Sequence, residues 1–161
     1  MIMVEKKTVY IETSIISYLT ARPSSDLLAA AWQKATMDWW ETQRRRFSIY
    51  ISDIVAKEAG RGDSQAAARR IKALEGIPLL DIDISVISLS RTLIREDALP
   101  EKAIDDSLHI AVSAVHGIDY LLTWNYRHID NAELKPIIRN ICAANGYECP
   151  EICTPHELMG V

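Results

Sequence analysis

Several carboxylates in this sequence fall where a strand should end or a helix should begin. Glu12 directly follows the apolar run Val9–Ile11, Glu58 follows a second apolar run, and Asp105 and Asp106 fall early in a segment with helical periodicity. In a parallel sheet, strand ends and the starts of the following helices share one edge. Unpaired carboxylates gathered there would repel one another, so the pattern predicts a bound Mg²⁺ or Mn²⁺, which prefer oxygen ligands.

Each acid also has a purely structural interpretation. A carboxylate in the first turn of a helix gains about 0.3–1 kcal/mol from the helix dipole, and Glu58 could simply be solvated. Neighbouring helical positions point in different directions, so at most one of Asp105 and Asp106 can face a shared site. The hydroxyls of Thr13 and Ser14 could cap the helix that follows Glu12, hold a metal-bound water, or do both.

The elements that must position these acids are visible as short apolar runs separated by helical stretches. The runs are apolar at successive positions, which is typical of parallel strands buried on both faces. They are Thr8–Ile11, Phe47–Ile51, Pro78–Ile82 and Asp119–Thr123. The alternation predicts an α/β fold, a three-layer α/β/α sandwich with a central parallel sheet of four to five strands.

Residues that typically begin or end helices support this interpretation. Asp63 can cap a helix that ends at Gly76, and Thr154 begins a capping box that predicts a short terminal helix. Residues 101–116 carry an apolar stripe typical of a helix packed on a sheet, at Ile104, Leu108, Ala111 and Val115. The segment 24–43 fits a helix with a broad apolar surface that includes Trp39 and Trp40; we expect it to pack inside its own domain, the alternative being a partner face.

Composition limits the class of protein. The chain has 161 residues with 48% hydrophobic and 25% charged residues, which predicts one ordinary folded domain, residues 1–161. A net charge of −4 excludes nucleic-acid binding driven by bulk positive charge, so any such binding must be local or carried by metal ions. No apolar stretch is long enough to span a membrane, and residues 1–7 lack the hydrophobic segment of a signal peptide, so we expect a cytoplasmic protein.

Three cysteines lie near the end of the chain, at Cys142, Cys149 and Cys153. An odd number in an apparently intracellular protein favours reduced, packed thiols. A zinc site completed by His156 is the alternative, but the intervals lack paired Cys-x2-Cys knuckles. The histidines His109, His116 and His128 are expected to be satisfied structural residues.

In order and separation, four segments resemble the PIN domain nucleases, the fold of the VapC-type toxins of toxin–antitoxin pairs. The resemblance covers nearly the whole chain and is carried by Tyr10–Ser14, Ser52–Glu58, Asp106–Ala111 and Leu121–Asn125. It implies that Glu12, Glu58 and Asp106 bind the metal and that Asn125 takes the place of a fourth acid. Asp105 is the second choice beside Asp106, because the spacing from Asp106 to Gly117 fits the family pattern better.

Two departures from the family pattern bear on activity, because the family usually has Asp where this chain has Glu12 and often has Asp where it has Asn125. The first lengthens the side chain by one methylene. The second removes a negative charge, so a second cation should bind more weakly, and Asp105 could partly compensate.

The resemblance implies a Mg²⁺- or Mn²⁺-dependent ribonuclease in which the metal activates a water that attacks the phosphodiester. Asn125 and Ser14 would orient water or substrate, and Arg61 and Arg127 would contact phosphate. It also implies a small antitoxin partner and a homodimer. The alternative is a catalytically weak or inactive PIN scaffold that binds RNA or a protein. A nucleotide- or flavin-binding domain is disfavoured because no glycine-rich phosphate loop follows Glu12.

Overall fold

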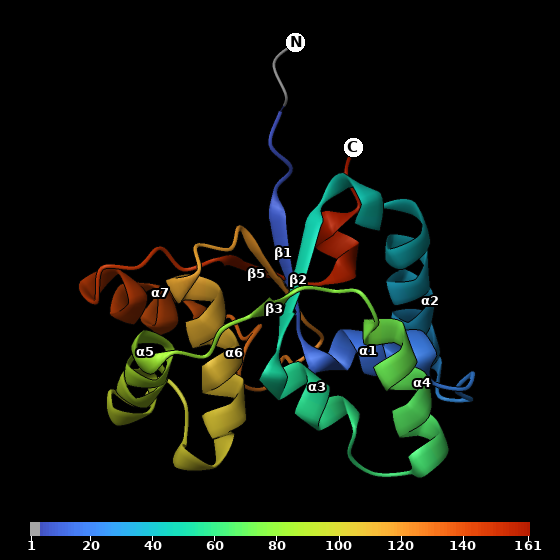
Figure 1. The fold of residues 1–161 in the computed structure, drawn as a ribbon, viewed down its shortest axis with the longest axis horizontal. Coiled ribbons are helices and arrows are strands. Elements are labelled where there is room, and N and C mark those ends of the chain that lie inside the picture. The colour runs from blue at the N-terminus through green and yellow to red at the C-terminus, as the bar shows by residue number, and fades with distance from the viewer. Residues whose placement is uncertain (1–3) are drawn as a thin grey trace.

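A computed structural model describes residues 4–161 and contains a five-stranded sheet that is parallel throughout. The strand order is β3-β2-β1-β4-β5 (Figure 1). The strands are β1 (Thr8–Ile11), β2 (Ser48–Ser52), β3 (Leu79–Leu80), β4 (Tyr120–Leu122) and β5 (Glu151–Cys153). Residues 1–3, the first part of the opening segment expected to lack a signal peptide, lie outside the described residues.

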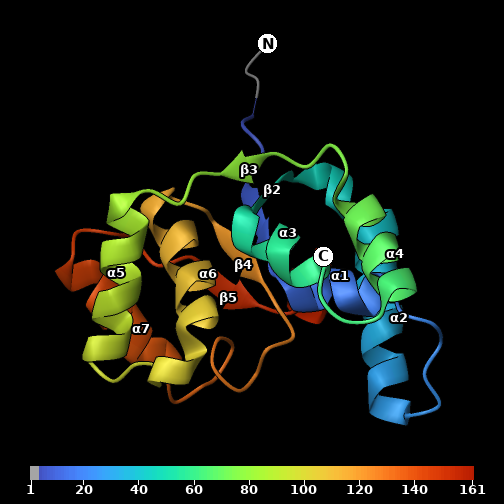
Figure 2. The ribbon, with the colours of Figure 1, turned by 60° about the horizontal axis from the view of Figure 1, so that its bottom comes forward.

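Helices cover both faces of the sheet, as the predicted three-layer sandwich requires (Figures 1 and 2). One layer holds α5 (Ile84–Arg95), α6 (Ile104–Val115) and α7 (Lys135–Ala144); the other holds α1 (Thr13–Thr20), α2 (Leu27–Thr42) and α4 (Ser64–Leu74). The short α3 (Asp53–Ala59) follows β2 and contacts helices of both layers. Three 3₁₀ turns complete the described elements: η1 (Arg44–Arg46), η2 (Glu101–Ala103) and η3 (Pro155–Leu158).

The two central strands form the middle of the core. Val9, Tyr10 and Ile11 of β1 and Leu121 and Leu122 of β4 are fully buried, as expected for strands covered on both sides. At the start of β1, the carboxylate of Asp119 accepts hydrogen bonds from the backbone N–H and the hydroxyl of Thr8, at 2.8 and 3.0 Å. These contacts fix the register of β1 against β4, and therefore the relative positions of the residues that follow both strands.

The predicted helix caps at Asp63 and Thr154 are confirmed. The Asp63 side chain caps α4 by accepting from the N–H of Ala66, and Thr154 forms the expected capping box, although the element after it is the 3₁₀ turn η3. Trp39 is fully buried and donates to the carbonyl of Leu158, so α2 packs inside the domain through this ring, whereas Leu27, Leu28 and Met37 of the same helix are exposed.

Two details of the predicted elements are wrong. β3 spans two residues instead of 78–82, because the chain leaves the sheet edge on either side of Leu79–Leu80. Ile104, predicted on the buried stripe of α6, is 43% exposed. Ser107, His109 and Ser113 are buried in α6 instead, because each finds a hydrogen-bond partner there.

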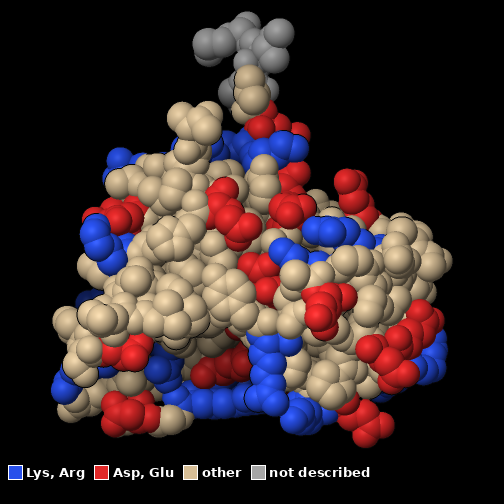
Figure 3. Space-filling view, turned by 180° about the vertical axis from the view of Figure 1, so that it is seen from behind, with Lys and Arg blue, Asp and Glu red and all other residues tan. Residues whose placement is uncertain are grey.

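Within residues 4–161 no helix has the length and apolarity that crossing a membrane requires. On the face shown in Figure 3, acidic and basic side chains are interspersed, in keeping with the modest net charge.

Candidate functional site

The candidate site lies at the edge of the sheet where the strands end. Glu12 directly follows β1, Thr123 directly follows β4, and Ser52 is the last residue of β2. The parallel register brings these positions together, and the N–H of Glu12 donates to the carbonyl of Leu122 at 3.1 Å. The carboxylates of Glu12 and Glu58, which lie in the segments that follow β1 and β2, are therefore placed at this edge of the sheet.

Glu12 is held in place by two hydroxyl groups. Its side chain is 5% exposed, and Oε2 accepts hydrogen bonds from Ser14 and, at 2.7 Å, from Thr123. Ser14 Oγ also accepts the backbone N–H of Trp124 at 2.8 Å, which links the start of α1 to the segment after β4. The hydroxyls of Thr13 and Ser14 do not cap α1; they bind carboxylates instead, so the capping interpretation is wrong.

Glu58 reaches the site from α3 and takes part in a buried chain of hydrogen bonds. Its Oε1 accepts from Thr13 at 2.9 Å and bonds to Nε2 of His109. The other ring nitrogen of His109 bonds to the Tyr10 hydroxyl at 2.7 Å, and that hydroxyl bonds to Ser52 at 2.7 Å. The ring of His109 is fully buried, so its orientation, and that of Glu58, is fixed by these contacts.

Three carboxylates act on His109 together. Burial tends to lower its pKa, but the hydrogen bond to Glu58 and the charges of Glu12, Glu58 and Asp106 outweigh burial and raise the pKa above its ordinary value. Burial tends to raise the pKa of Glu58, and the bond and charge of His109 reverse this and lower it. Glu12, Glu58 and Asp106 thus all lie close enough to His109 to favour its protonated form.

Asp106, in the first turn of α6, connects to the same network through Asn125. The Asn125 amide donates to Asp106 Oδ1 at 3.1 Å, and its backbone N–H donates to Thr123 Oγ1 at 2.9 Å, the hydroxyl that also binds Glu12. Asp106 Oδ2 bonds to Nδ1 of His128 at 2.8 Å. A continuous set of hydrogen bonds therefore joins Glu12 to Asp106.

The remaining predicted site residues lie around this network. Asp105 points elsewhere and pairs with Arg61 at 3.5 Å, as expected if only one of the adjacent aspartates faces the shared site. Arg127 is exposed. No ion pair of Arg127 is found within residues 4–161.

The sequence interpretation missed the roles of two histidines. His109 is buried, as expected of a structural histidine, yet it bonds to Glu58; His128 bonds to Asp106. Spacing carried a partial signal, since His109 lies one helical turn after Asp106 and His128 lies three residues after Asn125. That signal could not identify Glu58 as a partner, because Glu58 is distant in the sequence.

The donor chemistry of the site fits a hard divalent cation. Within residues 4–161, Oε1 of Glu12 and Oε2 of Glu58 receive no hydrogen bond, so each of these acids keeps one free carboxylate oxygen. With the side chains as they lie, no group of three or more His, Cys, Asp or Glu among these residues surrounds one point, because Glu58 and Asp106 are turned toward histidines. Binding an ion between these three acids would therefore require some of their side chains to rotate.

The three cysteines near the end of the chain are free thiols. As they lie within residues 4–161, Cys142, Cys149, Cys153 and His156 form no group of three or more metal-binding side chains. His156 lies edge-on to the ring of Trp124, with ring centroids 5.8 Å apart.

This parallel α/β sandwich carries carboxylates at the ends of its strands, the edge at which parallel α/β folds form their sites. The profile of one protein family, the PIN domain, matches residues 9–134, and the chain belongs to that family. PIN domains are generally nucleases that act on nucleic acid, typically with divalent metal ions. A comparison with curated proteins gives no significant match.

Proposed function

We propose that this PIN domain is a Mg²⁺- or Mn²⁺-dependent endoribonuclease and the toxin of a toxin–antitoxin pair, with Glu12, Glu58 and Asp106 as metal ligands. The observation that carries the proposal is the placement of Glu12, Glu58 and Asp106 at one edge of the sheet, where hydrogen bonds join Glu12 to Asp106 through Thr123 and Asn125. Within residues 4–161, Glu12 and Glu58 each keep one carboxylate oxygen that receives no hydrogen bond. A bound ion would lower the pKa of a water molecule and stabilise the charge that develops on the phosphate.

The contacts around each acid define what the protein itself contributes. Ser14 and Thr123 hold Glu12, Thr13 and His109 hold Glu58, and Asn125 and His128 hold Asp106. Such contacts fix ligand orientation before the ion arrives, and the loss of comparable contacts typically costs about 10–100-fold in metal affinity or activity. Asn125 thus acts by positioning Asp106, where the family often has a fourth acid.

Substrate contacts are assigned to cations at the rim. Arg61 lies close after Glu58 in the sequence, and the one ion pair of its side chain found within residues 4–161 is the exposed pair with Asp105, which a phosphate can replace at little cost. Arg127 follows Asn125 closely and is exposed. Ser14 borders the site beside Glu12. A homodimer regulated by a small antitoxin completes the proposal and rests on the resemblance alone. The proposed cytoplasmic location is instead the expectation from the sequence.

The test is cleavage of a mixed RNA pool by the full chain with Mn²⁺, with and without a chelator. Asp106→Asn should reduce the rate by more than about 100-fold, because it removes a ligand and not only an outer contact. Asp105→Asn is the matched control, since it alters a neighbouring acid outside the network and should keep most activity. Cleavage that survives in Asp106→Asn, or that is indifferent to the chelator, would refute the assignment.

A second candidate function, a scaffold that binds RNA without cutting it, is favoured by two observations. Glu58 and Asp106 are already paired with histidines, and Asn125 supplies no fourth charge. In that case RNA would bind with the same affinity in the presence of a chelator, no cleavage would occur with Mn²⁺, and Asp106→Asn would leave binding unchanged.

A further inference from the structure

The sheet has an incompletely covered edge far from the acids. Among residues 4–161, β3 pairs with β2 only at Ile51 and Ser52, so in this part of the chain residues 48–50, the first half of β2, have a strand partner on the β1 side alone. The chain that precedes β3 turns away toward α4, and Gly76 has a left-handed backbone with φ of 78°. The position that an N-terminal extension of β3 would occupy is therefore left open.

Backbone polar groups point into this opening. The N–H of Ser48 donates to the backbone carbonyl of Lys7 on the β1 side. The N–H of Ile51 donates to the backbone carbonyl of Pro78 on the β3 side, and both hydrogen bonds are 3.0 Å long. Because successive residues of a strand direct their backbone groups to alternate sides, the N–H and C=O of Ile49 face the open edge. An unpaired edge of this kind is a template for another extended chain.

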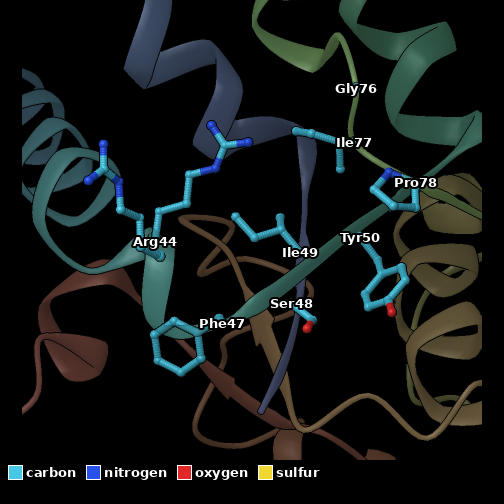
Figure 4. Close-up of a pocket in the computed structure, with 9 residues that line it drawn as sticks. Arg44, Phe47, Ser48, Ile49, Tyr50, Gly76, Ile77 and Pro78 are labelled. Atoms are coloured by element: carbon cyan, nitrogen blue, oxygen red, sulfur yellow. The ribbon is translucent and has the colours of Figure 1, made fainter. Parts of the chain in front are cut away.

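A cavity of about 380 Å³ borders this edge. In Figure 4 the side chain of Ile49 lies on one side of β2, and those of Ser48 and Tyr50 lie on the other. All three line the cavity together with Ile77 and Pro78, so the cavity is centred on the strand edge rather than on one face of the sheet. It therefore has room for the side chains of an added strand.

The cavity is electropositive. Arg44 and Arg45 line it, and within residues 4–161 no acid lies within ion-pair distance of either. The Arg44 guanidinium stacks over Trp40, 4.1 Å from the ring centroid, which holds it in place beside the opening. A ligand that complements this site must offer backbone hydrogen bonds and a negative charge.

We propose that the open half of β2 is a strand-addition site for an extended peptide segment of a partner protein, one that carries a carboxylate for Arg44 and Arg45. The peptide would exchange backbone hydrogen bonds with Ile49 and insert a side chain into the cavity. RNA fits this site less well. Its phosphates could bind the arginines, but its backbone has no N–H and C=O groups spaced to pair with those of a strand edge. The proposal is independent of nuclease activity.

The test uses NMR titration of the ¹⁵N-labelled full chain with an acetylated and amidated peptide, Val-Thr-Asp-Thr-Val. We expect the Ile49 amide to shift with a Kd of about 0.1–1 mM, as suits a short strand with few backbone bonds. A peptide with Asn in place of Asp, and one N-methylated on every second residue, should each bind at least about fivefold more weakly.

Protein variants separate charge recognition from unfolding. Arg44→Gln and Arg45→Gln should weaken binding of the acidic peptide at least about fivefold while the remaining spectrum stays that of the folded chain. Arg46→Gln, in the same 3₁₀ turn but outside the cavity lining, is the matched control and should bind normally. No shift at Ile49, equal binding by the N-methylated peptide, or tighter binding of a ten-residue oligouridine at Ile49 would each overturn the proposal.

Discussion

Replacing Asp119 should destabilise the protein through the register of β1 and β4. Its carboxylate accepts from the backbone N–H and the hydroxyl of Thr8, and Lys7 forms an exposed ion pair with it at 3.0 Å. Asp119→Ala removes all three contacts. The two contacts with Thr8 dominate, because exposed ion pairs contribute little.

The stability that Asp119→Ala should lose depends on how far the Asp119 side chain is exposed to water. A hydrogen bond to a charged group contributes about 1.5–3 kcal/mol when water is excluded. The Asp119 side chain is 32% exposed, so water replaces part of the lost contacts, and we expect a total loss of about 1.5–2.5 kcal/mol. For a chain of this length, that corresponds to a decrease in Tm of about 3–10 °C.

The loss should depend on pH in a defined direction. Burial tends to raise the pKa of Asp119, but the Thr8 N–H, Lys7 and the Thr8 hydroxyl outweigh it and lower the pKa below its ordinary value. A lowered folded pKa stabilises the protein above the unfolded pKa of about 3.9, and the stabilisation disappears as pH falls through the folded pKa. The difference between wild type and Asp119→Ala should therefore be constant from about pH 6 to 8 and shrink below about pH 4.

Urea denaturation at a series of pH values measures this difference. Glu148→Ala is the matched control, because Glu148 is an exposed acid that lines the same hollow and should change stability by less than about 0.5 kcal/mol. A loss below about 0.5 kcal/mol for Asp119→Ala, or one that stays constant down to pH 3, would refute the argument that this carboxylate fixes the register.

Three further substitutions test buried contacts by the same denaturation assay. His109→Ala should cost about 3–5 kcal/mol, because it leaves Glu58 without its buried partner; a cost under about 1 kcal/mol would contradict the pairing. Trp39→Ala should cost about 3–5 kcal/mol by opening a cavity beside η3, and a smaller loss would mean that α2 is not anchored by this ring. Lys135→Met should lower the free energy of unfolding by about 3 kcal/mol or more, because it leaves the buried carboxylate of Asp130 without the ammonium group of Lys135, which lies 2.6 Å from it. Unchanged stability would show that this ion pair is dispensable.

The sheet was largely predictable from the sequence because its strands are continuous apolar runs. Thr8–Ile11 was predicted with its observed bounds, and the second strand was displaced by one residue. The fifth strand, Glu151–Cys153, had no predicted range, because three residues at an edge carry little periodicity. The prediction for α6 is wrong at Ile104, which is the first residue of the helix and is 43% exposed. The buried face of α6 instead includes polar groups that have hydrogen-bond partners, as Ser107 has with Ser90 of α5 at 2.6 Å.

The site was predictable in position but not in its contacts. Strand ends and helix starts placed Glu12 and Asp106 at one sheet edge from sequence order alone. The bonds that orient them involve Thr123 and His128, whose side-chain directions depend on the loop after β4. A sequence pattern gives the elements that meet at an edge, whereas side-chain partners depend on rotations that only the packed structure defines.

His109 and His128 weaken the inference that converging carboxylates must bind a cation. Converging carboxylates are costly unless something compensates them, and from the sequence a divalent ion is the natural compensation. In the structure, His109 and His128 form hydrogen bonds to two of the acids. Under the proposed function, a metal would have to compete with these imidazoles for Glu58 and Asp106, whereas Oε1 of Glu12 receives no hydrogen bond within residues 4–161 that the metal would have to displace. Glu12→Gln should for this reason weaken Mn²⁺ binding in calorimetry more than Asp105→Asn does, and equal affinities in the two variants would contradict this order of access.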